Sequence, residues 1–312
     1  MPPDSADLTC KLIHFDLRNP VVLASGVMGI SPNLLKRAAD AGAGAVTSKS
    51  CGPKPRAGHA SPIVLDWGAG VINAVGLPNP GVNREVKNLI ETKQLLAESE
   101  TPLIGSFFAG TEEEFGQVAS IIAEAEPDML EVDISCPNVG DEFGLPFAAS
   151  TQTAAGVTRT IKKAVPHIPL SIKLGPNVPN IALIARAVVD AGADCITAIN
   201  TMPGMIIDAD SGKPVLTNKV GGISGPALKP IALKCVFDIA QAVSVPIIGL
   251  GGILSGRDAA EMLMAGATAI GVGTAVWYRG VAAFGIIVNE LTEFMLSHGY
   301  ADLASMRGLA LK

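Results

Sequence analysis

Two lysines and a cysteine stand at the ends of short apolar runs, where their chemistry could be used. Lys49 and Lys173 end two such runs, and Cys136 directly follows a third. An ammonium turned into an apolar pocket is costly unless it meets an anion, so each lysine is a candidate counter-charge for a cofactor or a substrate carboxylate. A thiol near a cation titrates close to neutral pH, which makes Cys136 a candidate nucleophile or acid/base. The alternatives are solvated lysines and a loop cysteine without chemistry.

Two glycine-containing run ends predict a phosphate site. Gly251-Gly252 and Gly273-Thr274 each follow an apolar run. Glycine lets backbone N–H groups approach an anion closely, and parallel barrels bind phosphate after their last two strands. Glycine at a strand end can also serve turn geometry alone, but the two ends together favour phosphate.

Eight short apolar runs must position these residues, and each is followed by a polar or glycine-rich turn. Helix-period segments lie between several of them, and this alternation predicts a parallel sheet. Gly42, Gly192 and Gly266 are expected to stop helices, and Ser255 with Asp258 resembles a capping box. The expected strands are residues 21–25, 45–49, 103–107, 129–135, 170–174, 195–200, 247–251 and 269–273. The expected helices include residues 31–41, 112–126, 181–191, 228–242 and 258–265.

Eight βα units in a chain of 312 residues predict an α/β fold, the TIM (β/α)8 barrel, with its site at the carboxyl ends of the strands. We expect one domain over residues 1–312. An open doubly wound sheet is the competing fold, but it would need G-x-G-x-x-G after the first strand, and residues 24–29 lack that spacing. Two longer inserts, residues 51–83 and 203–225, are expected to be loops over the barrel mouth.

Composition excludes several classes of function. The net charge is −6 without any basic run, so the electrostatic footprint of a nucleic-acid-binding protein is missing. No stretch approaches the ~18 consecutive apolar residues of a spanning helix, and no secretory signal is recognisable. Five cysteines without a C-x-x-C pair fit a reducing cytoplasm and give no local metal or iron–sulfur site. We therefore expect a cytoplasmic protein without nucleic acid, membrane or metal.

Motifs spread from about Leu8 to Met306 resemble dihydroorotate dehydrogenase of the class 1 type. Single pieces such as Gly-Gly-Ile are common, whereas the combination is specific. The motifs are Ala24-Ser25-Gly26, Thr47-Ser48-Lys49-Ser50, residues 73–79, residues 134–138, Lys173 before Pro176-Asn177-Val178, Asn200-Thr201, residues 222–225, Gly251-Gly252-Ile253 and Gly273-Thr274.

The resemblance implies a flavin-dependent barrel that oxidises (S)-dihydroorotate to orotate in pyrimidine synthesis. The phosphate of FMN would lie at the two glycine turns, and Lys173 would hold the edge of the flavin ring. Cofactor contacts implied by the resemblance come from Ala24, Ser25, Gly26, Lys49, Ser50, Ser106, Asp133, Lys173, Ile199, Asn200, Gly225, Gly251, Gly252, Gly273 and Thr274. Substrate contacts would come from Lys49, Asn73, Gly76, Leu77, Asp133, Asn138, Asn200 and Thr201.

The same resemblance gives the catalytic roles. Cys136 would remove the C5 proton while the C6 hydride passes to flavin N5, and Lys49 would offset the developing negative charge. A serine at position 136 would mark the membrane-bound class, so the cysteine favours the soluble class. Residues 200–208 are most similar to the NAD-linked subtype. That subtype works with an electron-transfer subunit carrying FAD and a [2Fe-2S] cluster, so the resemblance predicts a homodimer or a heterotetramer.

Asp133 departs from the family, which usually has asparagine there. A carboxylate cannot donate a hydrogen bond, and beside an anionic substrate it would cost about 1 to 4 kcal/mol, depending on the effective dielectric constant. Asp133 is therefore protonated, or paired with Lys173 or Lys49, or the substrate is another pyrimidine. Two alternative functions stay open: a flavin enzyme for another dihydropyrimidine, and a flavin-free barrel aldolase or isomerase with Lys173 as the Schiff-base amine.

Overall fold

Eight parallel strands close into a barrel in a computed structural model that describes residues 5–135 and 147–312. Going round the barrel, the strands follow one another in chain order, and every neighbouring pair is parallel. The structure thus confirms the TIM barrel and all eight expected strands, several of them shorter than expected. The strands are β3 (Val21–Leu23), β4 (Ala45–Thr47), β7 (Leu103–Phe107), β8 (Met129–Asp133), β9 (Leu170–Leu174), β10 (Cys195–Ala198), β15 (Ile247–Leu250) and β16 (Ala269–Val272).

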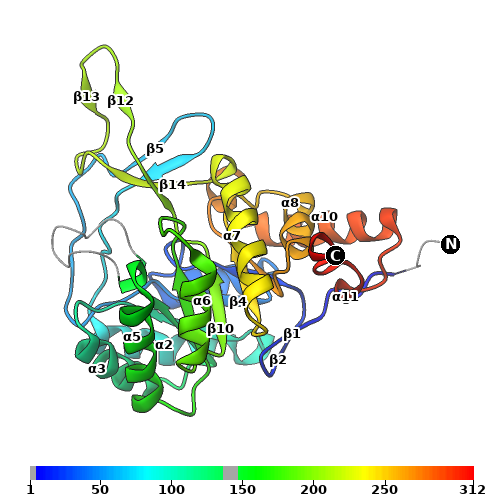
Figure 1. The fold of residues 1–312 in the computed structure, drawn as a ribbon, viewed down its shortest axis with the longest axis horizontal. Coiled ribbons are helices and arrows are strands. Elements are labelled where there is room, and N and C mark those ends of the chain that lie inside the picture. Colours follow the sequence, from blue (N-terminus) through cyan, green and yellow to red (C-terminus); the bar gives the residue numbers. More distant parts are fainter. Residues whose placement is uncertain (1–4, 136–146) are drawn as a thin grey trace.

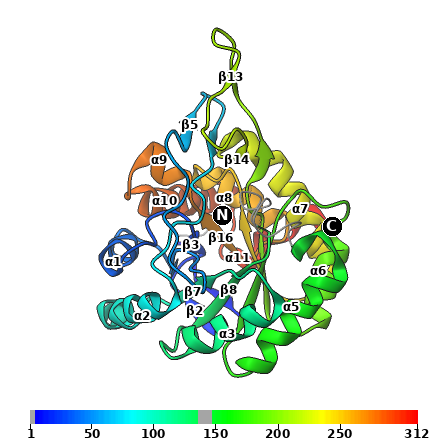
Figure 2. The same ribbon diagram turned by 90° about the vertical axis from the view of Figure 1, so that its left-hand side faces the viewer.

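Helices form the outer layer, and Figure 2 shows several of them arranged around the strands. Gly42, Gly192 and Gly266 have positive φ angles after their helices, as expected of helix-stopping glycines. Ser255 and Asp258 form the predicted capping box. The helices are α1 (Pro32–Asp40), α2 (Val82–Leu96), α3 (Glu112–Ala123), α5 (Thr151–Ala164), α6 (Ile181–Asp190), α7 (Lys229–Ala242), α8 (Gly256–Met264), α9 (Ala275–Arg279), α10 (Ala283–His298) and α11 (Leu303–Met306).

Side chains along each barrel strand point alternately to the helix layer and to the barrel interior, so the core has two parts. In β8, Leu130 and Val132 pack outward against the helices, so Met129, Glu131 and Asp133 face the barrel interior. The amino-terminal end of the interior is apolar. It is closed by the hairpin of β1 (Cys10–Leu12) and β2 (Phe15–Leu17), whose two leucines are buried in the interior cluster. The carboxyl end of the interior carries polar residues, and these are also buried.

The two inserts expected to be loops contain strands, which corrects the sequence-based expectation. Four short strands make an antiparallel sheet in the order β11-β14-β6-β5. Its central pairing joins β6 to β14, which are distant in the sequence, and such long-range pairing leaves no local signal. A further hairpin of β12 and β13 extends away from the barrel (Figure 1). The bounds are β5 (Val64–Asp66), β6 (Val71–Asn73), β11 (Met202–Gly204), β12 (Ile207–Asp208), β13 (Lys213–Pro214) and β14 (Gly221–Ser224).

Candidate active site

A cavity of about 540 Å³ lies at the carboxyl ends of the barrel strands, within the size range of cofactor and small-molecule sites. It gathers nearly every residue that the sequence singled out. Cys136 and Asn138 lie outside the described residues. The expected site residues that line the cavity are Ala24, Ser25, Gly26, Lys49, Ser50, Asn73, Gly76, Leu77, Asp133, Lys173, Ile199, Asn200, Thr201, Gly225, Gly251, Gly252, Gly273 and Thr274.

Glycines keep parts of the cavity wall free of side chains. A methyl group on Gly26 would have Lys49 Nζ as its nearest neighbour, 4.0 Å away, and one on Gly273 would meet nothing closer than 3.8 Å. Both glycines line the cavity, so these methyl groups would take up cavity space. Gly251 and Gly252 have φ angles of 127° and 74°, which favour glycine. Side chains at these two positions would collide with Ala232 and Lys229, so the wall near β15 needs glycine there.

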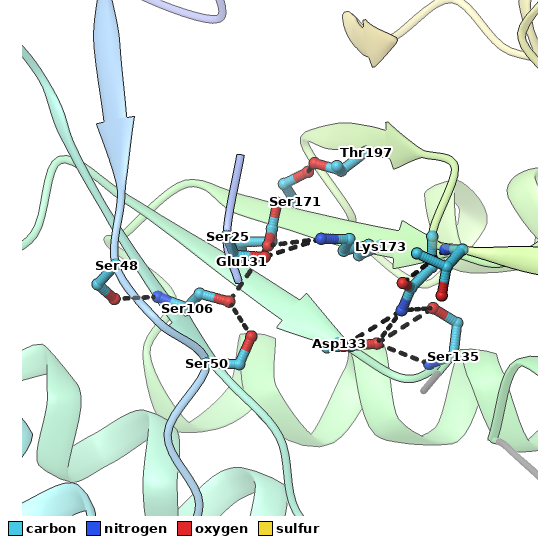
Figure 3. A network of polar contacts seen from close by, with 12 residues as sticks. Ser25, Ser48, Ser50, Ser106, Glu131, Asp133, Ser135, Ser171, Lys173 and Thr197 are labelled. Carbon is cyan, nitrogen blue, oxygen red and sulfur yellow. Dashed lines mark hydrogen bonds and ion pairs between the residues drawn. The ribbon is translucent and has the colours of Figure 1, made fainter. Parts of the chain in front are cut away.

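Lys173 is held by one residue of β8 and by one residue that follows β3. Its Nζ donates a hydrogen bond to Ser25 Oγ at 2.8 Å and lies 3.6 Å from Glu131 Oε1 (Figure 3). Lys173 is only 5% exposed and Glu131 only 3%. A buried ammonium is tolerated when it is paired with an opposite charge, and Glu131 supplies that charge. The ammonium is thus fixed at the floor of the cavity.

Ser106 lies behind the cavity wall rather than on it. It is fully buried, and its Oγ lies 2.8 Å from Ser50 Oγ and donates to Glu131 Oε1 at 3.2 Å (Figure 3). Its backbone N–H donates to Ser48 Oγ at 3.0 Å. Ser106 therefore links the cavity-lining Ser50 to the carboxylate beneath Lys173.

Asp133 is surrounded by hydrogen-bond donors. Its Oδ1 accepts from the backbone N–H and the hydroxyl of Ser135, at 3.0 and 3.1 Å. Asn200 Nδ2 donates to both carboxylate oxygens, at 3.3 and 3.4 Å. These partners suit an ionised carboxylate, which only accepts. Asn200 Oδ1 accepts from the backbone N–H of Thr201 at 2.7 Å, so the orientation of the Asn200 amide is fixed as well.

The possible pairing of Asp133 with Lys173 is wrong, because the lysine pairs with Glu131 instead. In the strand register, Asp133 does lie opposite Lys173, and Glu131 lies opposite Ser171. The lysine side chain crosses diagonally to the earlier inward position of β8, within reach for so long a side chain. The Glu131 carboxylate, which pairs with Lys173, therefore lies below the cavity wall, whereas Asp133 lines the wall itself.

The loop after β6 is held from outside the cavity. Gly76 and Leu77 have φ angles of 79° and 53°, and a side chain on Gly76 would collide with His59. His59 Nδ1 lies 3.0 Å from the carbonyl oxygen of Ala74. Asn73 Nδ2 donates to the carbonyl oxygen of Gly222 at 3.3 Å, which fastens the loop to β14. The loop is shaped to present Asn73, Gly76 and Leu77 to a ligand.

Sequence reasoning missed Glu131 and Ser135 as parts of the site. A signal for Glu131 was present, because it lies two residues before Asp133 in the same strand and so shares its face. The mouth also contains Val276 and Trp277 of α9 and Leu228, which no motif indicated. Apolar mouth residues lack a chemical signature, so they become visible only once the barrel is closed.

The four cysteines that the structure describes are poor nucleophiles. Burial raises the pKa of Cys10 and of Cys195 to about 12 and the pKa of Cys235 to about 11, and it also raises the pKa of Cys51. None of these four lines the cavity. The remaining cysteine, Cys136, lies outside the described residues.

Comparisons with known proteins decide the family. The sequence model of the dihydroorotate dehydrogenase family matches residues 7–295. The chain is 42% identical to "Dihydroorotate dehydrogenase B (NAD(+)), catalytic subunit" of Methanosarcina mazei, over 97% of this chain and 95% of that one. Proteins of the same name are 44% identical in Methanocaldococcus jannaschii and 41% in Pyrococcus horikoshii, over 92% and 98% of this chain and 93% and 98% of theirs. The chain belongs to the dihydroorotate dehydrogenase family.

Dihydroorotate dehydrogenases are flavin enzymes, and the cavity fits a flavin. A ring needs an open floor with a cation at its edge, which Gly26, Gly273 and Lys173 provide. The two glycine turns, Gly251-Gly252 and Gly273-Thr274, line the same cavity. Among the helices that the structure describes, none is long and apolar enough to cross a membrane.

Proposed function

We propose that this chain is the catalytic subunit of an NAD-linked dihydroorotate dehydrogenase, which oxidises (S)-dihydroorotate to orotate in pyrimidine biosynthesis with FMN as cofactor. The observation that carries the proposal is the convergence of Lys49, Lys173, Asn73 and Asn200 with the two glycine turns in one cavity at the barrel mouth. The names of relatives that match this chain over nearly its whole length support the same activity.

For FMN, we propose that the phosphate binds backbone N–H groups of Gly251, Gly252, Gly273 and Thr274. Lys173 would meet the edge of the flavin ring. Lys173 Nζ donates to Ser25 Oγ and faces Glu131 Oε1 at 3.6 Å, which leaves one of its three donors for a ligand. The remaining proposed contacts are Ala24, Ser25, Gly26, Lys49, Ser50, Asp133, Ile199, Asn200 and Gly225, and Ser106 would act through Ser50.

For the substrate, we propose that the ammonium of Lys49 meets the carboxylate of dihydroorotate. Amide groups are suited to the ring, because its carbonyl and N–H groups require both acceptors and donors. These would come from Asn73, Asn138 and Asn200, with the hydroxyl of Thr201 as a further donor or acceptor and with Gly76 and Leu77 closing over the ring. Asp133 can accept an N–H of the substrate but cannot donate to it.

For the chemistry, we propose that Cys136 removes the C5 proton from one face of dihydroorotate. A bound flavin supplies the acceptor for the hydride that leaves C6 from the other face. Loss of one proton and one hydride produces the C5–C6 double bond of orotate. The Lys49 ammonium would offset negative charge that develops as the proton leaves, and the cavity wall would fix the reacting ring.

For the electrons, we propose a partner subunit that carries FAD and a [2Fe-2S] cluster and passes them to NAD. The relatives' shared name, with its words "NAD(+)" and "catalytic subunit", supports this. We further propose that residues 1–312 act as one FMN-binding domain, in a homodimer or a heterotetramer with the partner. The absence of C-x-x-C spacing among five cysteines favours a reducing, cytoplasmic setting.

A second candidate substrate is a neutral dihydropyrimidine such as dihydrouracil. The observation that favours it is the Asp133 carboxylate at the cavity wall, which would repel the carboxylate of dihydroorotate. The two Asp133 oxygens are stabilised by Ser135 and Asn200, which lessens this repulsion. Dihydroorotate remains the first choice because Lys49 lines the same cavity.

The test is the visible spectrum of the purified chain under anaerobic conditions. We expect a yellow protein with bound FMN, bleached by one equivalent of dihydroorotate and far more slowly by dihydrouracil. Bleaching by dihydrouracil and not by dihydroorotate would show that the neutral dihydropyrimidine is the substrate. A colourless protein that takes up no FMN would contradict both and favour the flavin-free aldolase or isomerase.

A further inference from the structure

We propose that Glu131 is a positioning residue, which holds the ammonium of Lys173 in place against the flavin. This rests on the proposed function, since it assigns Lys173 to the flavin edge. Glu131 itself does not line the cavity, so it would act only through the lysine.

The geometry places Glu131 at the centre of a buried network. Its Oε1 accepts from Ser106 Oγ at 3.2 Å and lies 3.6 Å from Lys173 Nζ, while the lysine donates to Ser25 Oγ at 2.8 Å (Figure 3). Ser106 in turn contacts Ser50 Oγ at 2.8 Å. Three cavity-lining residues, Ser25 after β3, Ser50 after β4 and Lys173 in β9, are thus connected to one carboxylate.

Charge explains why the carboxylate is needed. Lysine has four rotatable bonds, and fixing it costs conformational entropy that a hydrogen bond to one serine offsets poorly. Glu131 attracts the ammonium from below, in a buried site where such attraction is weakly screened. Because Glu131 leaves one lysine donor free, it can hold the ammonium without occupying the position that a ligand would use.

The other groups around Lys173 do not replace Glu131. On β10, Thr197 lies opposite it in register and its hydroxyl contacts Ser171 Oγ at 2.8 Å. On β8, Asp133 is engaged by Ser135 and Asn200. Cys195 is fully buried near Glu131, and burial raises its pKa to about 12, so it is neutral. The negative charge that pairs with the lysine is therefore that of Glu131.

The experiment measures sulfite binding to the FMN-loaded chain. Sulfite adds to N5 of oxidised flavin and leaves the ring anionic, so its affinity reports a cation fixed at the ring edge. We expect Glu131→Gln to weaken sulfite binding at least 10-fold and to slow flavin reduction by dihydroorotate, with KM little changed. If Glu131 supplied only negative charge, its removal would leave sulfite binding unchanged or tighter, and either result overturns the proposal.

Two variants make the test specific. Glu85→Gln replaces a buried carboxyl group in α2 that does not line the cavity, and we expect less than a 3-fold change in sulfite affinity. In a Lys173→Met background, Glu131→Gln should have no further effect, because the group that it positions is gone. A full additive effect in that background would contradict the proposal.

Folding can be separated from positioning. Removing one member of a buried ion pair is more disruptive than neutralising both. If Glu131→Gln alone does not fold, we expect the double variant with Lys173→Met to fold. Equal failure of both would contradict the pairing. Wild-type chain that is not bleached by dihydroorotate would contradict the proposed function instead, so the two failures are distinguishable.

Discussion

The two ends of the barrel interior are built from the same strands but from different residue types. Near the amino-terminal end, the inward positions hold Ile104, Met129 and Cys195, packed in one apolar cluster. Two residues further along each strand, the inward positions hold Ser106, Glu131 and Thr197, all buried. The first set needs only shape and volume to be stable, whereas the second needs partners. Stability and chemistry are thus separated along the barrel axis by one step of strand alternation.

The largest expected effect is a loss of catalysis with no loss of stability. We expect Cys136→Ala to keep bound FMN and the unfolding midpoint, and to lower kcat by roughly 10²–10⁴-fold, the range for loss of a positioned base. Stopped-flow reduction by dihydroorotate measures it. Cys235→Ala is the matched control, because that thiol lies in α7 away from the cavity, and it should leave kcat unchanged. Normal kcat in Cys136→Ala would remove the residue from its role.

A substitution in the apolar end of the barrel interior should lower the stability of the fold and leave catalysis unchanged. Met129→Ala truncates a side chain that is 1% exposed, and we expect a loss of about 2–5 kcal/mol in the free energy of unfolding. Denaturant titration measures that loss, and activity per folded, flavin-loaded chain should stay near the wild-type value. A large fall in specific activity without destabilisation would show that the two ends are not separate.

Glu85 is a buried acidic residue of the helix layer, so it can be compared with the buried acidic residues of the barrel interior. Burial raises its pKa to about 7, although Asn88 donates to it at 3.1 Å. The folded chain then binds this proton more tightly than the unfolded chain, so stability is lost as pH rises from about 4.5 to 7, by at most ~3 kcal/mol. Urea titrations at pH 5 and pH 8 measure this loss. Glu85→Gln should flatten the pH dependence, and an unchanged slope would contradict the assignment.

The smallest expected effect is on ligand affinity and concerns Asp133 in the cavity wall. Asp133→Asn removes a negative charge beside the substrate site, so we expect dihydroorotate to bind about 5-fold or more tightly, with dihydrouracil little affected. Titration of the oxidised enzyme with orotate checks this by equilibrium binding. Asp40→Asn, at the exposed end of α1, is a charge-matched control that does not line the cavity. Weaker orotate binding in Asp133→Asn would mean that the carboxylate serves the ligand.

Much of the fold and most of the site could be predicted from sequence. The eight strands are apolar runs that alternate with helix-period segments, and glycine or polar residues mark their carboxyl ends, so Gly251, Gly273 and Lys173 were expected in one cavity, which they line. The Glu131–Lys173 pair could not be predicted, because it depends on how far a side chain leans across the β8–β9 register. The mouth sheet was missed for a related reason: Ile72 pairs with Ile223, which lies about half the chain length away in the sequence.

The most direct measurement of the central claim is a crystal structure of this chain with FMN and orotate bound. We expect the flavin and orotate rings to stack at the carboxyl end of the barrel. Lys173 Nζ should lie at the flavin edge, and Cys136 Sγ should lie on the face of the orotate ring that is turned away from the flavin. A structure in which Cys136 or Lys173 faces away from the bound rings would contradict the claim.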